Sequence, residues 1–179
     1  PALVGAEDVV VVDEFAHASL FAGIKLSGAR VLVAKHNQVV DFARHLESAA
    51  LHRGRARVLV VTESVFSMDG DTAPLAALRA LCTQHDAWLL VDDAHGFLVA
   101  DDVIDVSDAD VVTGTLSKAV GGYGGVVAGS RVVCDLLFTR CRPVLFGTAL
   151  PPAVVAAASA ALDVAVADVE RRRRPRLLA

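Results

Sequence analysis

The sequence predicts an α/β protein with a doubly wound, mostly parallel sheet. Short β-branched runs alternate with helical stretches along the 179 residues, as in repeated strand–helix units. Hydrophobic residues make up 54% of the chain and aromatic residues only 5%, so valine, leucine and alanine must build the core. That composition suits parallel strands covered by helices on both faces.

Strands are predicted where apolar, β-branched residues run together and stop at a polar residue or a glycine. They cover residues 9–12, 30–34, 58–62, 88–91, 111–113, 125–128 and 144–146. Helices are predicted from apolar residues at three- and four-residue spacing, over residues 17–26, 39–48, 74–85, 132–140 and 153–170. The first helix should stop at Ser27 and Gly28, and Pro74 suits the first turn of the third.

Composition also narrows the class of partner. The net charge of −4 favours neither nucleic acid nor an anionic membrane, and we interpret the run of arginines at residues 171–174 as a solvated helix end. Charged residues interrupt each apolar run well before the length of a membrane span. We read the mean hydropathy of +0.52 as buried surface, part of it at a subunit interface. The three widely spaced cysteines, Cys82, Cys134 and Cys141, indicate a reduced, cytoplasmic protein rather than a disulfide framework.

The strongest candidates for catalytic residues follow two of the predicted strands. Lys118 follows a β-branched run, with Thr115 three residues before it, and Asp92 and His95 follow another apolar run. A lysine desolvated at such a place forms Schiff bases, although a lone lysine on a surface turn is the simpler alternative. Chemistry in open α/β sheets gathers at strand ends. An amine, a carboxylate and an imidazole there suit pyridoxal 5'-phosphate (PLP): the amine holds the aldehyde as an imine, and the carboxylate keeps the ring nitrogen protonated.

Five sequence words strengthen this interpretation. They are DEFAHASL at residues 13–20, VTESVFSMDGD at 61–71, VDDAHG at 91–96, TGTLSK at 113–118 and FGTALPP at 146–152. In these words and their order the chain resembles the α-oxoamine synthases of the fold-type I PLP superfamily, closest to the biotin-pathway branch. The resemblance implies the large domain of the aminotransferase-like fold.

The resemblance also implies an activity. It is a PLP-dependent decarboxylative condensation of an amino acid, L-alanine, with an acyl thioester, pimeloyl-CoA or pimeloyl-ACP, in a cytoplasmic homodimer. The alternatives are another α-oxoamine synthase (a 2-amino-3-ketobutyrate CoA ligase, a 5-aminolevulinate synthase or a serine palmitoyltransferase type) and a non-catalytic fragment or degenerate domain of this fold. A flavodoxin-like binding module explains the strand pattern but leaves the lysine and aspartate words unexplained.

By the same resemblance, residues 1–179 correspond to the central part of a large domain. An upstream helix that cradles the cofactor phosphate and a C-terminal small domain with an arginine for the substrate carboxylate are expected to be absent. Residues 97–110 form a short, acidic connection where relatives have a glycine-rich loop, and this departure puts the activity of the chain in doubt.

The resemblance assigns roles to individual residues. Lys118 forms the imine and moves the substrate α-proton, and Asp92 pairs with the ring nitrogen. His95 and Ser67 share the phenolic oxygen; a metal-ligand role for His95 is the alternative, and no metal is expected. Thr115 binds the phosphate, a role compatible with capping the following turn.

Other candidates have structural alternatives of equal simplicity. Thr148 reaches the phosphate of a neighbouring subunit or lies in an ordinary turn, and His17 lies near the cofactor or begins a helix. Asp93 points away from Asp92 and suits a turn bond or cap, whereas Glu63 lies near the substrate. We interpret the remaining histidines as surface residues: His36, His45, His52 and His85.

Overall fold

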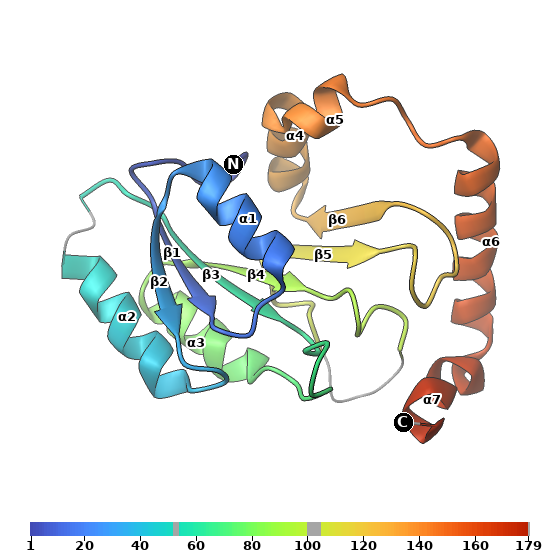
Figure 1. The fold of residues 1–179 in the computed structure, drawn as a ribbon, viewed down its shortest axis with the longest axis horizontal. Coiled ribbons are helices and arrows are strands. Elements are labelled where there is room, and N and C mark those ends of the chain that lie inside the picture. The colour runs from blue at the N-terminus through green and yellow to red at the C-terminus, as the bar shows by residue number, and fades with distance from the viewer. Residues whose placement is uncertain (52–53, 100–104, 179) are drawn as a thin grey trace.

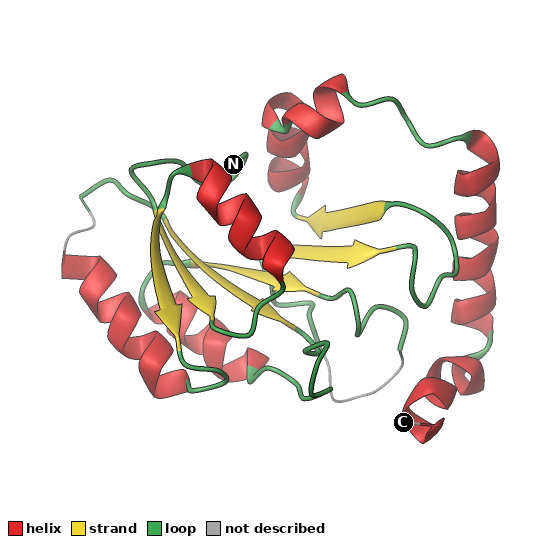
Figure 2. Cartoon of the chain, viewed as in Figure 1, coloured by secondary structure: helices red, strands yellow, loops and turns green. Residues whose placement is uncertain are grey.

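The computed structural model describes residues 1–51, 54–99 and 105–178, and these form a six-stranded sheet with helices on both faces (Figure 1; Figure 2). The strand order is β2-β1-β3-β4-β5-β6; β1 to β5 are parallel, and β6 is antiparallel to β5. The predicted fold class is confirmed. The strands are β1 (Val9–Asp13), β2 (Arg30–Ala34), β3 (Val58–Glu63), β4 (Trp88–Asp92), β5 (Val111–Thr115) and β6 (Gly125–Gly129).

Helices cover the two faces of the sheet and divide the core. Helices α1 (Ala18–Ser27) and α4 (Arg131–Arg140) pack on one face, and α2 (Val39–Leu51) and α3 (Leu75–Gln84) pack on the other. Because side chains alternate along a strand, Val10 and Val12 of β1 join the core under α1, while Val9 and Val11 join the core under α2 and α3. Every residue of β1 and β3 is buried, as expected of central parallel strands.

The strand predicted at residues 144–146 is wrong, because these residues belong to the helix α5 (Arg142–Phe146). The amides of Val144 and Leu145 each donate to the carbonyl of Cys141 at 2.9 Å, and Pro143 supplies a backbone angle suited to a first helical turn. Strand propensity reflects packing on a pleated sheet. This segment follows α4 directly and does not join the sheet, so its β-branched and aromatic residues do not produce a strand.

The single long helix predicted over residues 153–170 is also wrong. It divides into α6 (Pro152–Ala167) and α7 (Val169–Leu178). Asp168 interrupts the helical backbone with φ −118° and ψ 85°, and its carboxylate accepts the N–H of Arg171 at 2.9 Å. An aspartate in this position caps a new helix, so the alanine-rich periodicity continues past a real break.

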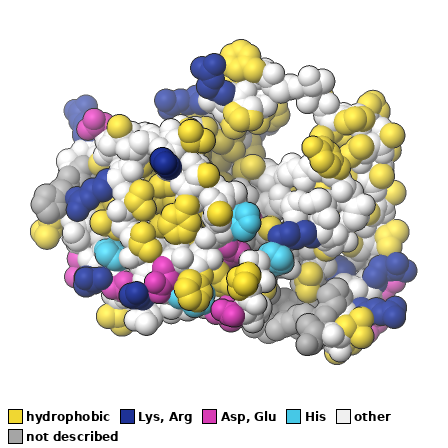
Figure 3. Space-filling model, viewed as in Figure 1, with side chains coloured by type: hydrophobic (Ala, Val, Ile, Leu, Met, Phe, Trp, Pro, Cys, Tyr) yellow, Lys and Arg dark blue, Asp and Glu magenta, His cyan; other side chains and the backbone are white. Residues whose placement is uncertain are grey.

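The segment after β6 leaves much apolar surface uncovered. Helix α6 buries Ala158 against Leu116 and Val120, but large side chains on α4 to α7 remain exposed (Figure 3). Among the described residues no helix has the length and apolar character needed to cross a membrane. The exposed apolar residues include Phe138, Leu145, Phe146, Val155, Val164 and Val166.

Phe42 is the largest of the fully buried side chains, at 0% exposure between α2 and the sheet. Truncation to alanine removes its contacts and leaves a cavity, so we expect Phe42→Ala to lower the free energy of unfolding by about 3–5 kcal/mol. Val40, on the same helix and 82% exposed, is the matched control: Val40→Ala should change that free energy by no more than about 0.5 kcal/mol. Urea denaturation followed by circular dichroism measures both, and equal losses in the two variants would contradict the described core.

Candidate active site

A row of polar side chains crosses three neighbouring strands at their carboxyl ends. Glu63 of β3 lies opposite Asp92 of β4, and Asp92 lies opposite Thr113 of β5. Residues in register on parallel strands point to the same face, and the residues two positions earlier, Val61, Leu90 and Val111, pack under α1. The row therefore faces the α1 side of the sheet. It lies at the carboxyl ends of the strands, where open α/β sheets bind ligands.

A cavity of about 420 Å³ opens over this row. Its walls come from the start of α1, the three strand ends and the turns after β4 and β5. Five of the residues predicted from the sequence thus meet at one cavity: Lys118, Asp92, His95, Thr115 and His17. The complete lining is His17, Ser19, Leu20, Glu63, Asp92, Ala94, His95, Thr113, Gly114, Thr115 and Lys118.

Lys118 and His95 contact each other directly across the cavity. The Nζ atom of Lys118 lies 2.7 Å from Nε2 of His95. The side chain of Lys118 is exposed, so the desolvated lysine expected from the sequence is not observed. The reason is local, because Lys118 lies three residues past the end of β5, beyond the buried part of the strand.

Burial and the contact with Lys118 together determine the charge of His95. Partial burial lowers the pKa of His95, and the positive charge of Lys118 lowers it further, against an opposing effect of Asp92. The imidazole is therefore neutral at pH 7, and its Nε2 can accept a hydrogen bond from the Lys118 ammonium.

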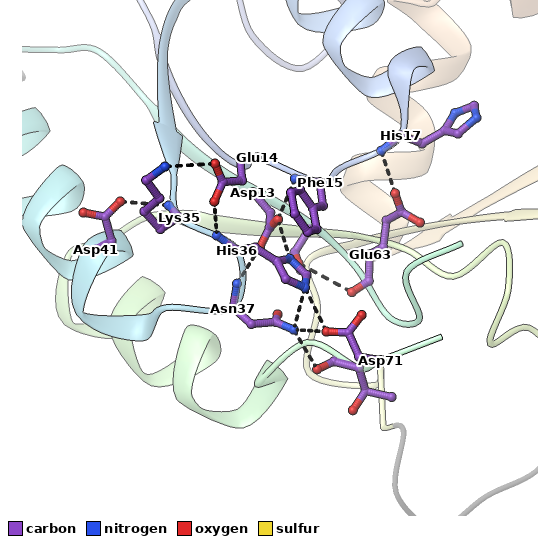
Figure 4. A network of polar contacts seen from close by, with 12 residues as sticks. Asp13, Glu14, Phe15, His17, Lys35, His36, Asn37, Asp41, Glu63 and Asp71 are labelled. Carbon is purple, nitrogen blue, oxygen red and sulfur yellow. Dashed lines mark hydrogen bonds and ion pairs between the residues drawn. The ribbon is translucent and has the colours of Figure 1, made fainter. Parts of the chain in front are cut away.

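Glu63 is a buried carboxyl at the floor of the cavity, with 3% exposure. Its Oε1 accepts the backbone N–H of His17 at 2.6 Å (Figure 4). Burial raises the pKa of Glu63; the bond from His17 opposes this, and the nearby charge of Asp92 adds to it. A carboxyl of raised pKa in a cavity is a candidate for proton exchange, which gives Glu63 more weight than its position after a strand suggests.

Asp93 points to the opposite side of the sheet edge from Asp92. Its carboxylate accepts a hydrogen bond from the Ser64 hydroxyl, and burial raises its pKa. Gly96 makes room for this pair, because a Cβ there would lie 2.3 Å from Oδ1 of Asp93 and 2.7 Å from the Ser64 hydroxyl. Asp93 is thus part of the scaffold behind the site and does not line the cavity.

Thr115 serves the turn that carries Lys118. Its hydroxyl lies 2.7 Å from the Ser117 hydroxyl and accepts the Ser117 N–H at 3.2 Å, as a capping residue does.

The glycines that follow return the chain to β6: Gly124 adopts φ +114°, and a Cβ there would lie 2.8 Å from Leu150. The positive φ and this close approach to Leu150 both favour a glycine at position 124.

Two predicted site residues lie elsewhere. Ser67 and Thr148 are both exposed, and neither lines the cavity. His17 lines it and also caps α1, since its Nδ1 accepts the Ser19 N–H at 3.2 Å. The structural interpretation of His17 is confirmed, and its place near a cofactor stays a prediction.

Thr113 is a site residue that the sequence analysis missed. It lines the cavity, and its buried hydroxyl has no hydrogen-bond partner among the described residues. The available signal was strand register, because Thr113 ends a run parallel to the one that ends at Asp92. An unpartnered hydroxyl beside an amine, a carboxylate and an imidazole fits a ligand with several polar atoms, such as PLP.

The surface assignment of the histidines is wrong for His36 and His45, whose side chains are each 17% exposed. His36 lies between Asp13 and Asp71, and His45 contacts the carbonyl of Val33 and the carboxylate of Asp41. His52 lies outside the described residues. Within the described ranges, no group of three or more His, Cys, Asp or Glu side chains is arranged to hold a metal ion, and His95 is not part of one.

The chain is 49% identical to the 8-amino-7-oxononanoate synthase of Methylobacterium radiotolerans over 179 residues, covering 100% of this chain and 46% of the relative. The protein of that name from Maricaulis maris is also 49% identical, with 100% and 47% covered. The chain therefore spans about half the length of the curated relatives it matches.

Solved structures agree with these relatives. A serine palmitoyltransferase from S. paucimobilis with bound PLP superposes with a TM-score of 0.88 at 32% identity, over 97% of this chain and 45% of that one. The 8-amino-7-oxononanoate synthase of Francisella tularensis superposes with a TM-score of 0.72 at 28% identity, over 92% of this chain and 48% of that one. Both names are those of α-oxoamine synthases, so the resemblance found in the sequence words is confirmed. Residues 2–176 match the aminotransferase class I and II family, and the chain belongs to that family.

Proposed function

We propose that this chain is the cofactor-binding part of a PLP-dependent enzyme of biotin synthesis, which condenses L-alanine with a pimeloyl thioester and releases carbon dioxide. The observation that carries the proposal is the cavity where Lys118 meets His95 above Asp92. The relatives at 49% identity are named 8-amino-7-oxononanoate synthases, which supports this reaction, and the serine palmitoyltransferase structure with a PLP–myriocin aldimine supports the cofactor.

The residues of the cavity offer the groups that PLP requires. Lys118 would hold the aldehyde through Nζ, Asp92 would pair with the ring nitrogen, and His95 would hydrogen-bond the phenolic oxygen. The hydroxyl of Thr115 would bind the phosphate. The unpartnered hydroxyl of Thr113 is a further donor for the ligand.

When bound, PLP supplies an electron-accepting ring that stabilises negative charge on the substrate carbon. The Nζ amine of Lys118 takes the α-proton of the amino acid and later returns one. Neutral His95 accepts a hydrogen bond from that amine and holds it over the cavity. The carboxylate of Asp92 keeps a proton at the ring nitrogen, and Glu63 beside it is poised to exchange a proton with bound substrate.

The proposal includes a homodimer in the cytoplasm. The exposed apolar residues of α4 to α7 support association, and a dimer would let exposed Thr148 reach the phosphate in a neighbouring subunit. Cys82, Cys134 and Cys141 are free thiols in the structure, which suits a reducing compartment.

A serine palmitoyltransferase type of reaction is the second candidate. The structural agreement favours it, with a TM-score of 0.88 against 0.72 for the Francisella tularensis synthase. Sequence identity favours the first candidate, at 49% against 32%. A thiol-release assay with alanine or serine and with pimeloyl-CoA or palmitoyl-CoA separates the two.

The test of the proposed cofactor site is borohydride reduction of the chain after incubation with PLP. The sequence has only three lysines, Lys25, Lys35 and Lys118, so peptide mapping gives an unambiguous answer. We expect visible absorbance of an imine before reduction and a PLP label on Lys118 after it. Labelling of Lys25 or Lys35 in preference to Lys118 contradicts the proposal.

A further inference from the structure

His36 lies at the centre of a cluster of polar side chains (Figure 4). Its Nδ1 lies 2.9 Å from Oδ1 of Asp13, and its Nε2 lies 2.8 Å from Oδ2 of Asp71. Asp13 ends β1 and is fully buried, whereas Asp71 belongs to the loop after β3. One imidazole therefore joins two loops that are far apart in the sequence.

The two carboxylates determine the charge of the ring. An ionised carboxylate only accepts hydrogen bonds, so a carboxylate at each ring nitrogen favours the protonated form of His36, in which both nitrogens donate. The neighbouring groups agree: burial lowers the pKa of His36, but the bonds to Asp13 and Asp71 outweigh it and raise the pKa overall. The other charged groups here belong to one chain of contacts: Glu14 accepts the His36 N–H, and Lys35 pairs with Glu14 and donates its N–H to Asp41. Asp41 in turn pairs with Arg44 and His45.

Two aromatic rings hold the imidazole in place. Phe15 stacks on it with ring centroids 4.4 Å apart, and Phe66 meets it edge-on, also at 4.4 Å. A cation over an aromatic face is attracted to the ring as well as packed against it. Asn37 closes the cluster, since its amide donates to Asp71 at 2.7 Å and its backbone N–H donates to Asp13 at 3.0 Å.

One partner of His36 adjoins a residue of the proposed site. Phe15 lies two residues before His17, whose N–H binds Glu63 on the cavity floor. Phe66 directly precedes Ser67, and the turn that carries Ser67 is closed by the N–H of Phe66 on the Asp71 carbonyl and by the N–H of Gly70 on the Phe66 carbonyl, each at 2.9 Å. We propose that His36 is a positioning residue, which holds residues 13–17 and residues 64–72 together and so places His17 at the wall of the cavity.

This inference rests on the proposed function only for its effect on the cofactor. The bonds from His36 to Asp13 and Asp71, here called the clamp, depend on the charge of the His36 ring. Because the pKa of His36 is raised in the folded protein, its stabilisation is complete below the ordinary value of about 6.5 and is lost as the pH rises through the raised value. Asp71→Asn removes one of the two carboxylates, so it should move this loss to lower pH.

The first experiment needs no cofactor. Imidazole NMR of the 179-residue chain should show His36 titrating above 6.5 and Asp71→Asn lowering that pKa, while His45→Asn leaves it unchanged. In His36→Asn, hydrogen exchange at the amides of Phe66 and Gly70 should rise about tenfold or more, because a charged hydrogen bond is lost, with core amides of β1 and β3 protected as before. An ordinary pKa for His36, or an equal rise at all amides, overturns the proposal.

The second experiment measures PLP release by gel filtration between pH 6 and pH 9. We expect release from the parent chain to increase as His36 loses its proton, and the same increase to occur at lower pH in Asp71→Asn but not in His45→Asn. Identical pH profiles for the three proteins overturn the positioning role. A parent chain that binds no PLP at any pH refutes the proposed function instead, and the exchange experiment then decides the clamp alone.

Discussion

Lys118→Ala is expected to abolish covalent capture of PLP, which is the largest effect of a single substitution in this chain. Lys118 is the one lysine that lines the cavity among the described residues, and no other amine there can form the imine. The visible absorbance that survives gel filtration should disappear, and thiol release from pimeloyl-CoA should fall by several orders of magnitude, since both the covalent hold and the proton carrier are removed.

Lys25→Ala is the control for this substitution. Lys25 is exposed on α1 and does not line the cavity, so its removal should leave both the absorbance and the borohydride label unchanged. If Lys118→Ala retains a PLP label at the stoichiometry of the parent chain, the imine has been assigned to the wrong amine.

Asp92→Asn is expected to retain PLP and to lose turnover about a hundred- to a thousandfold. The carboxylate of Asp92 lies between Glu63 and Thr113 in the row beneath the cavity. An amide of the same shape keeps the packing but cannot stabilise a proton on the ring nitrogen, so the ring accepts electrons poorly. Thiol release in the presence of alanine measures the loss, and the absorbance of bound PLP shows that binding persists.

Asp93→Asn is the matched control, because the two aspartates are adjacent in the sequence and face opposite sides of the sheet edge. Asparagine can keep a bond to the Ser64 hydroxyl, so turnover should stay within a few-fold of the parent value. A loss as large as that of Asp92→Asn would show that the effect belongs to the strand end in general rather than to the ring partner.

Most of the fold could be predicted because its signals are local. Four consecutive valines in β1 favour a buried strand. Gly28, with φ +74°, ends α1 at the position where a glycine in the sequence predicts a helix end. The wrong predictions concern segments whose secondary structure depends on the surrounding fold rather than on local residue preferences. Val144 has strand propensity but no strand to pair with, and Asp168 breaks a helix whose alanine pattern continues through it.

The candidate site divides in the same way. Lys118, Asp92 and His95 could be placed together because parallel strands bring their carboxyl ends to one edge. His36 could not, because its partners Asp13 and Asp71 are 23 and 35 residues away and only the folded chain brings them together. The exposure of Lys118 was likewise hidden, since it depends on how far the turn after β5 extends beyond the sheet.

The opposite orientation of Asp92 and Asp93 has a consequence for how such a protein can change over generations. The pleat of the strands assigns the reacting groups to one side of the sheet and the Asp93–Ser64 and Asp13–His36 pairs to the other. Substitutions on the α1 side can then alter the cavity without touching the bonds that brace the strand ends. One scaffold can thus be inherited nearly intact while its catalytic side diversifies.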